Sequence, residues 1–377
     1  MQKTKLLTIL PILSIITFFI IPVFPSANTI TKSPSSKTPM QEPRSGLGIA
    51  VAYNKIYAIG GINQEGFRST VEEYDLTSDT WSFKTNMPTP RSEFGIAVID
   101  SKIYCIGGYI NGFSATNITE MYDPATDTWE TKTPMPTARM DIEANVVNNK
   151  IYIIGGIPNS TINEVYDPIT DSWQTDTSIP TAVCSYASAV INNSIYIIKS
   201  NTTQIYSIEN SSWHYGTPPI SATVLASVGT TKGLGIPEQI YVYAADADLP
   251  YWQLTLRNFT IQSYEPKTDR WTICFSTSQG RLDPGIVIVS DTIYVIGGYK
   301  LDSANDERTI NPSITYCTEN EQYFLNNHIP EFSSWIGLLF FLSAITVTIL
   351  YKKLHNKQQT SNNTNHDNKL RPHINSS

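Results

Sequence analysis

Few residues of this 377-residue chain are suited to catalysis or metal binding. Of its five histidines, only His214 lies between residues 44 and 326, and no histidine–cysteine cluster has the spacing of metal ligands. With one histidine in that region, we do not expect a Ser-His-Asp triad. We therefore expect no catalytic residues, no metal and no cofactor.

One arginine recurs at a fixed place and is the best candidate for ligand contact. It stands twelve residues before the isoleucine of an apolar run, as Arg44 does before Ile56. Because a guanidinium binds carboxylates through two parallel hydrogen bonds, these arginines are suited to an acidic group on a ligand. The four arginines at this position are Arg44, Arg91, Arg139 and Arg281.

A structural role for these arginines is the alternative. Glu93, Asp141 and Asp283 each follow one of them by two residues. Ion pairs between neighbouring units would leave little charge for a ligand.

The arginines belong to a repeat of six units. The run KIYAIGG (55–61) returns as KIYCIGG (102–108), KIYIIGG (150–156) and TIYVIGG (292–298). Each run is followed by a tyrosine and, seven residues later, by a second aromatic residue. Two weaker copies, SIYIIKS and QIYVYAA, fill the gap, and the units are mostly 44 to 53 residues apart. The repeat positions are Gly60, Gly61, Gly107, Gly108, Gly155, Gly156, Gly297, Gly298, Tyr74, Trp81, Tyr122, Trp129, Tyr166, Trp173, Tyr206, Trp213, Tyr264, Trp271, Tyr316 and Tyr323.

The residue pattern of each unit predicts strands and turns rather than helices. Short stretches rich in β-branched and aromatic residues alternate with Asp-Pro and Pro-Thr turns. A period in this range decides the fold. Four strands in each of six units predict an all-β, six-bladed β-propeller.

The sequence resembles the kelch family over about three quarters of its length. The resemblance depends on the double glycine, the tyrosine-to-tryptophan spacing and the Met-Pro-Thr-x-Arg segment that opens a unit. The fourth and fifth units depart from it, with Lys199-Ser200 and Ala244-Ala245 in place of the glycine pair. The resemblance implies blades whose second strand is buried on both faces, with the tyrosines and tryptophans packed between blades. The alternative is that these aromatic rings form a platform for a ligand.

The blades divide the chain as follows. The propeller spans residues 44–326, with blades at about 44–88, 89–136, 137–180, 181–219, 220–278 and 279–326. We expect the last blade to take its outer strand from Glu321 to Leu325, because Tyr323 stands where other blades have tryptophan. The competing hypothesis is closure by the N-terminal segment SSKTPM (35–40).

Hydrophobic segments at both ends predict a membrane protein. Residues 1–27 have the form of a signal peptide and 28–43 that of a linker; an uncleaved anchor is the alternative. After a second linker at 327–331, residues 332–351 carry no charge and are long enough to span a bilayer as a helix. Lysines follow it, so the tail 352–377 should be cytoplasmic and the propeller extracellular.

Smaller features agree with an exterior location. Six Asn-x-Ser/Thr sequons within the propeller predict a glycoprotein, at Asn117, Asn159, Asn192, Asn201, Asn210 and Asn258. The segment IPEFSSW (329–335) resembles the sorting signal of some archaeal surface proteins, whose last helix is removed; an uncut linker is the alternative. Cys105 is expected to be a buried free thiol, and a bridge between Cys274 and Cys317 is conceivable.

Two functions are compatible with these patterns. The first is a membrane-tethered extracellular binding module for a protein or glycan, with its ligand face formed by the four arginines and by Tyr251 and Trp252 of a long loop. The second, implied by the kelch resemblance, is an enzyme of the isomerase or oxidase class acting on carbohydrate. A carboxylate or histidine pair in the channel mouth would favour the enzyme. A net charge of −7 without a basic stripe argues against nucleic acid as a partner.

Overall fold

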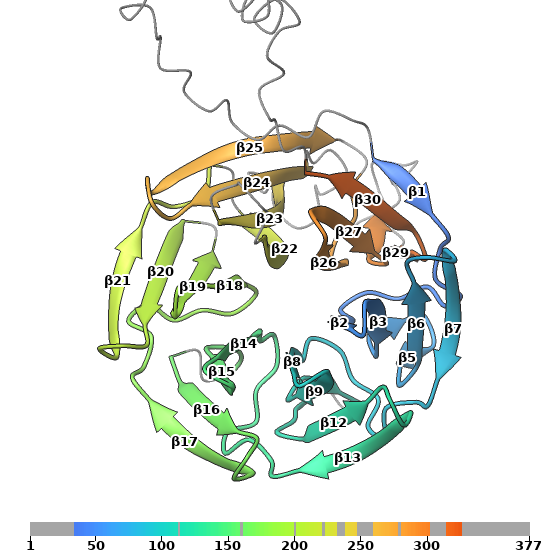
Figure 1. Ribbon diagram of the computed structural model, residues 1–377, viewed down its shortest axis with the longest axis horizontal. Helices are drawn as coiled ribbons and strands as arrows, with labels where there is room; N and C mark the ends of the chain where they lie inside the picture. Colours follow the sequence, from blue (N-terminus) through green and yellow to red (C-terminus); the bar gives the residue numbers. More distant parts are fainter. Residues whose placement is uncertain are drawn as a thin grey trace, which may run out of the picture. The chain divides into compact units, whose positions relative to one another are not determined.

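Six four-stranded antiparallel sheets stand around a central channel in the computed structural model (Figure 1). The structure describes residues 34–111, 114–158, 161–199, 201–220, 223–231, 238–246, 259–277, 280–301 and 314–325. All of them belong to one compact unit, Ala27–Asn326. The prediction of an all-β, six-bladed propeller is therefore confirmed.

Each blade runs from an inner strand at the channel to an outer strand at the rim. Blades one and two consist of β2 (Gly48–Ala52), β3 (Lys55–Ile59), β6 (Val71–Asp75) and β7 (Thr80–Lys84), then β8 (Gly95–Ile99), β9 (Lys102–Ile106), β12 (Thr119–Asp123) and β13 (Thr128–Lys132). Blades three and four consist of β14 (Ala144–Val147), β15 (Lys150–Ile154), β16 (Asn163–Asp167) and β17 (Ser172–Asp176), then β18 (Ala187–Ile191), β19 (Ser194–Lys199), β20 (Thr202–Ser207) and β21 (Ser212–Gly216). Blades five and six consist of β22 (Thr223–Thr231), β23 (Gln239–Asp246), β24 (Phe259–Glu265) and β25 (Arg270–Thr277), then β26 (Gly285–Val289), β27 (Thr292–Ile296), β30 (Asn320–Phe324) and β1 (Ser35–Lys37).

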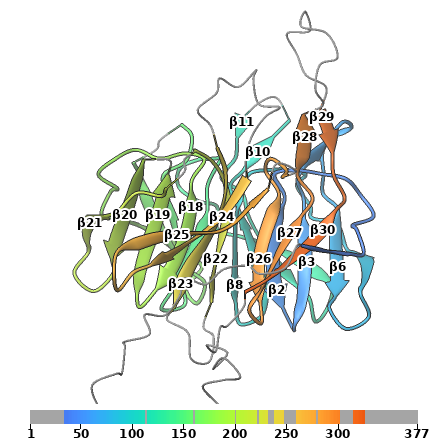
Figure 2. The same cartoon turned by 90° about the horizontal axis from the view of Figure 1, so that it is seen from above.

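Short hairpins extend three of the loops that follow the second strands. They are β4 (Ile62–Asn63) with β5 (Gly66–Phe67), β10 (Tyr109–Ile110) with β11 (Ser114–Ala115), and β28 (Tyr299–Leu301) with β29 (Ile314–Tyr316). Figure 2 shows β10–β11 and β28–β29 rising from the same face of the propeller. In blade four the second and third strands remain paired as far as Lys199 and Thr202. This face is therefore uneven around the channel.

The N-terminus closes the ring, which corrects the expected arrangement of the last blade. β30 is the third strand of blade six: it pairs with β27 on one side and with β1 on the other. Tyr323 lies opposite Ile293 just as Tyr74 lies opposite Ile56, so Tyr323 corresponds to a blade tyrosine and not to a tryptophan. Tyr316 belongs instead to the β28–β29 hairpin. The expected linker 28–43 therefore contains the closing strand.

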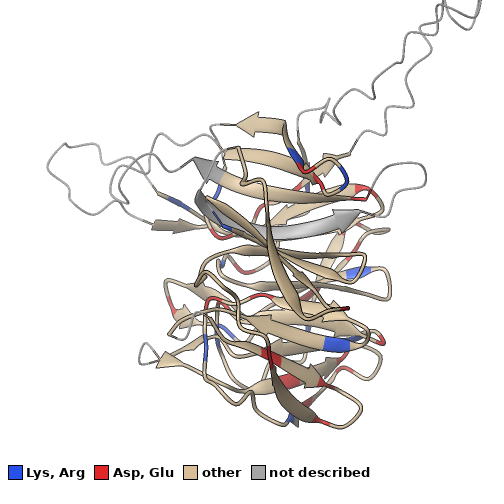
Figure 3. Ribbon diagram, turned by 90° about the vertical axis from the view of Figure 1, so that its left-hand side faces the viewer, with Lys and Arg blue, Asp and Glu red and all other residues tan. Residues whose placement is uncertain are grey.

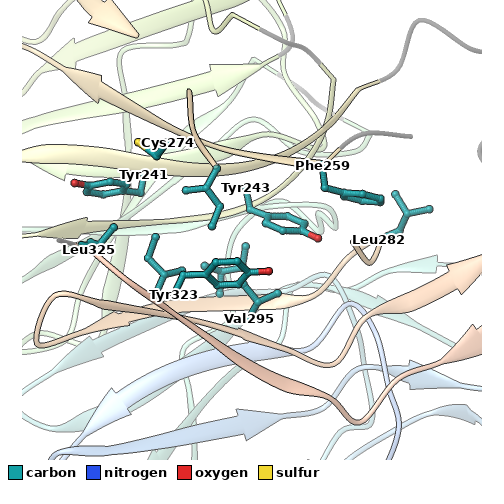
Figure 4. Close-up of a cluster of buried hydrophobic side chains, with 11 residues drawn as sticks. Tyr241, Tyr243, Phe259, Cys274, Leu282, Val295, Tyr323 and Leu325 are labelled. Atoms are coloured by element: carbon teal, nitrogen blue, oxygen red, sulfur yellow. The ribbon is translucent and has the colours of Figure 1, made fainter. Parts of the chain in front are cut away.

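The core consists of apolar layers between neighbouring blades. The second strand of blade one is buried on both faces, with Ile56 and Ala58 packed against blade six and Tyr57 and Ile59 against blade two. Figure 4 shows the layer between blades five and six, where Tyr243, Phe259 and Tyr323 meet Val295. A continuous apolar run in the sequence thus corresponds to a strand covered on both sides.

The same side-chain hydrogen bonds recur from blade to blade at the outer rim of the propeller. Tyr74 donates a hydrogen bond to Asp79, whose carboxylate accepts the backbone N–H of Thr38 at 3.1 Å. The indole of Trp81 donates to the Thr38 carbonyl at 2.8 Å. Trp129, Trp173, Trp213 and Trp271 make the same bond to the blade before them. Each tryptophan thus joins its blade to the preceding one, and in blade one this bond holds the closing segment.

Three further expectations concern the two membrane segments and the cysteines. In the part of the chain that the structure describes, no helix has the length and apolarity needed to cross a membrane. The predicted signal segment 1–27 and helix 332–351 lie outside the described residues. Cys105, Cys274 and Cys317 are buried free thiols, so the suggested Cys274–Cys317 bridge is not formed.

Candidate functional site

The four repeat arginines are buried inside their blades. The Arg44 guanidinium donates to the carbonyls of Ala58, Gly60 and Thr70 at 3.2, 3.0 and 2.6 Å, and to the Glu72 carboxylate at 2.9 Å. The side-chain exposure of Arg44, Arg91, Arg139 and Arg281 is between 0 and 1%. These side chains therefore offer no surface to a ligand in this structure.

A glutamate on the third strand of the same blade is the partner of each arginine. The pairs are Arg44–Glu72 at 2.9 Å, Arg91–Glu120 at 2.5 Å, Arg139–Glu164 at 2.6 Å and Arg281–Glu321 at 3.2 Å. Burial raises the pKa of Glu72 and lowers that of Arg44, so desolvation opposes the ion pair. The bonds of Arg44 to three backbone carbonyls offset that cost. The expected pairing of the arginines with Glu93, Asp141 and Asp283 between blades is therefore wrong.

A sequence signal for the true partner exists, two residues before each blade tyrosine. That position is Glu in every blade that has the arginine, and Gln204 and Gln262 in blades four and five. In blade four, Val183 replaces the arginine, and Gln204 exchanges hydrogen bonds with the backbone of Thr181 at 2.9 and 3.0 Å. Arginine and glutamate are thus lost together.

Five residues of the channel lining stand two positions after the repeat arginine or, in blade four, after Val183. We call Gly46, Glu93, Asp141, Ser185 and Asp283 the mouth residues. All five have left-handed backbone conformations, with φ between 44° and 59°. The two side chains point in different directions. The side chains of Arg91, Arg139 and Arg281 are buried in their blades, whereas the acid two residues after each of them lines the channel.

Backbone hydrogen bonds join the mouth residues across blades. The N–H of Gly46 donates to the Asp283 carbonyl at 3.2 Å, that of Glu93 to Gly46 at 2.9 Å, and that of Asp141 to Glu93 at 2.9 Å. The Ser185 hydroxyl continues the series by donating to the Asp141 carboxylate at 2.5 Å. Five blades are therefore linked in order around the channel mouth.

Next to these mouth residues the channel forms a cavity of about 700 Å³. Its walls are apolar side chains of the inner strands, including Ile96, Val98 and Ile288. Glu143 and Tyr299 complete the lining near the mouth residues. A second cleft of about 510 Å³ lies beside blade one, where Glu42 is already paired with Arg68. The channel is the better candidate because its carboxylates have no such cationic partner.

The electrostatics of the channel favour protonated acids. Burial, and then the charges of Asp141 and Asp283, raise the pKa of Glu93 to about 7. Burial and Asp141 raise the pKa of Glu143 to about 8 and that of Asp283 to about 6. Part of the Glu93 side chain is exposed, whereas the raised pKa reflects the blades around the channel, which displace solvent near its carboxyl group.

Within the described ranges, none of these four carboxyl groups forms an ion pair with lysine or arginine. Nor do any three His, Cys, Asp or Glu side chains of the described residues gather closely enough to hold a metal ion. Charged residues elsewhere are interspersed in sign on the side shown in Figure 3. The candidate site is thus an acidic mouth over an apolar cavity.

The remaining predicted ligand residues, Tyr251 and Trp252, lie outside the described residues. Aromatic rings do stand on the same face: Phe67 of β5 packs edge-on against Tyr109 of β10, with ring centroids 5.0 Å apart. The sequence analysis named Glu93, Asp141 and Asp283 as partners of the arginines but did not predict that they line the channel. Their fixed position two residues after the arginine was the sequence signal that could have indicated this role.

Comparison with known proteins shows a similarity to kelch repeats over part of the chain. The family model for the KLHDC2/KLHL20/DRC7 Kelch-repeats domain matches residues 21–200. The solved structure of YjhT superimposes with a TM-score of 0.60 at 14% identity, covering 76% of this chain and 96% of that one. At this identity the likeness shows the fold alone.

Curated relatives match shorter stretches. Kelch-like protein terF of Aspergillus terreus is 34% identical over 129 residues, which are 33% of this chain and 27% of that protein. The Influenza virus NS1A-binding protein homologs of Xenopus laevis and Mus musculus are 50% and 52% identical over 46 residues, 12% of this chain and 7% of each protein. The matches therefore span less than a third of these relatives.

Proposed function

We propose that this kelch-repeat propeller is a non-catalytic binding module that takes a basic segment of a partner protein at its channel mouth. The observation that carries the proposal is an acidic channel mouth over a cavity of about 700 Å³, whose carboxylates form no ion pair with lysine or arginine among the described residues. Kelch-repeat propellers commonly serve as protein-interaction modules, which supports this class of function.

The chemistry of the mouth selects the kind of partner. A lysine or arginine head group would meet Glu93, Asp141 and Asp283, while its aliphatic stem would lie along the isoleucine-lined wall. Charge complementarity of this kind supplies specificity and association rate more than raw affinity. A neutral glycan would leave the carboxylates uncompensated, so we favour the protein partner over the glycan.

A carbohydrate-acting enzyme is the second candidate, and one observation favours it. Carboxyl groups do line the mouth, and the pKa of Glu93 is raised toward that of a general acid. Acid–base chemistry by two carboxyls needs environments that push their pKa values apart. Here burial raises the pKa of Glu93, Glu143 and Asp283 alike, which supports binding over catalysis.

Binding of a labelled hexalysine peptide to the full chain tests the proposal. At about pH 8.5, where the carboxyls are mostly ionised, fluorescence anisotropy should detect saturable binding. Combining Glu93→Gln, Asp141→Asn and Asp283→Asn should weaken it by about tenfold or more, equivalent to about 1.4 kcal/mol. Asparagine tolerates the left-handed backbone at 141 and 283, so the fold should survive.

The matched control is Glu209→Gln, which removes an exposed carboxylate from a rim turn of blade four. This variant should bind like the parent chain. Because this control removes one carboxylate and the mouth variant three, a control that loses about a third of the binding free energy lost by the mouth variant would show that the peptide responds to net charge and not to the mouth.

The same proposal places the propeller outside the cell, held by a helix at 332–351 with a cytoplasmic tail. The sequon residues Asn192, Asn201 and Asn210 are exposed, as glycosylation outside the cell would require. Protease added to intact cells should cut propeller loops and spare a tag after Ser377. Loss of the tag from outside would contradict this topology.

A further inference from the structure

Four carboxyl groups gather where the entry turns of the blades meet. We call Glu93, Asp141, Glu143 and Asp283 the mouth carboxyls; all four line the channel cavity. Three of them sit in turns whose backbones are hydrogen-bonded in series from blade six through blade one to blade three. Their charges are therefore brought together by the same contacts that close this end of the ring.

We propose that the mouth carboxyls form a proton-controlled switch of the channel's charge. When protonated they leave the mouth neutral and let the linked turns pack without repulsion; when ionised they repel one another and attract a cation. The role of the charged state in ligand capture rests on the proposed function, whereas the titration itself does not.

The groups facing the mouth carboxyls give this switch little compensation. Burial raises the pKa of Asp141 overall, although the Ser185 hydroxyl and Lys199 of blade four act to lower it. Tyr186 accepts the Glu143 N–H at 3.2 Å and donates its own proton to the Ile154 carbonyl. Blade one contributes uncharged Gly46, and blade six contributes Tyr299 beside Asp283. Side chains of the inner strand of blade five lie outside the described ones.

The direction of the pH dependence follows from the raised values. The pKa of Glu93 is about 7, of Glu143 about 8 and of Asp283 about 6, above the ordinary carboxyl values of 4.5 and 3.8. The folded protein therefore binds more protons than the unfolded chain between those limits. Their contribution to stability is complete below about pH 4 and is lost as pH rises through about 6 to 8.

The aspartates at the outer rim of the propeller affect stability in a different pH range. The pKa values of Asp79, Asp127, Asp171 and Asp269 are lowered by their hydrogen bonds, although burial opposes this shift. Their contribution is lost only on acidification below the ordinary carboxyl value. The two groups of acids can thus be separated by pH.

Thermal unfolding of the full chain from about pH 5 to about pH 8.5 tests the switch. The unfolding temperature of the parent should fall by about 5 °C or more over this range. The double variant Glu93→Gln, Glu143→Gln should lose at least half of that fall, because two of the titrating groups are gone. Glu209→Gln should retain the full dependence, and subtraction removes contributions shared by all three proteins.

Infrared spectroscopy provides a second readout that does not depend on stability. The carbonyl stretch of protonated carboxyl groups should persist in the parent at about pH 6.5 and weaken in the double variant. An unchanged pH slope together with an unchanged infrared band in that variant would overturn the switch. A flattened slope without hexalysine binding at any pH would support the switch and refute the proposed function.

Discussion

At the scale of single residues, position in the repeat decides between a structural and a functional role. Arg139 and Asp141 are two residues apart, yet the arginine is buried and the acid lines the channel. Their types and spacing could be predicted from the sequence. Their surroundings could not, because the left-handed turn at Asp141 sets the direction of each side chain.

The buried arginine–glutamate pair leads to a stability prediction that the chain itself suggests. Changing Arg139→Val should destabilise the fold by about 3–5 kcal/mol, because Glu164 would be left charged and buried. Adding Glu164→Gln recreates the Val183–Gln204 combination of blade four and should recover at least about half of the loss.

Urea unfolding monitored by tryptophan fluorescence gives both free energies. The control is Glu164→Gln alone, which leaves Arg139 bonded to the carbonyls of Ile153, Gly155 and Ile162. If the double variant proves no more stable than Arg139→Val, the coupled loss of both residues in blade four has another cause.

At the scale of the elements, the sequence predicts the second strand and its glycine pair well. Gly60 has φ of 61°, and a Cβ there would lie 2.7 Å from the carbonyl of Arg91. The next residue, Gly61, donates its N–H to that same carbonyl at 2.9 Å. The glycines thus admit the backbone of the neighbouring blade, where a Cβ would clash.

The last blade shows where strand prediction fails. The β28–β29 hairpin places Tyr316 seven residues before Tyr323 and imitates the tyrosine-to-tryptophan spacing. Pairing partners, which the sequence does not state, identify β30 as a third strand. The segment that supplies β1 has no apolar run of its own, and Thr38 is held through Asp79 and Trp81 of blade one.

At the scale of the whole molecule, the ring brings together residues that are far apart in the chain. Asp283 and Gly46 are neighbours at the mouth only because the N-terminal strand closes the propeller. The sequence analysis predicted a ligand face formed by the four repeat arginines with Tyr251 and Trp252. The described structure buries the arginines and places carboxylates at the channel mouth.

The central claim is that the partner binds at this mouth, and cross-linking locates the ligand directly. A hexalysine peptide carrying a photoreactive group should be irradiated with the full chain, and the modified residues mapped by mass spectrometry. We expect cross-links at the entry turns around Gly46, Glu93 and Asp141, and on the β28–β29 hairpin. These cross-links should disappear in the triple mouth variant. Cross-links concentrated instead at the rim turns near Asp79 and Asp127 would contradict the claim.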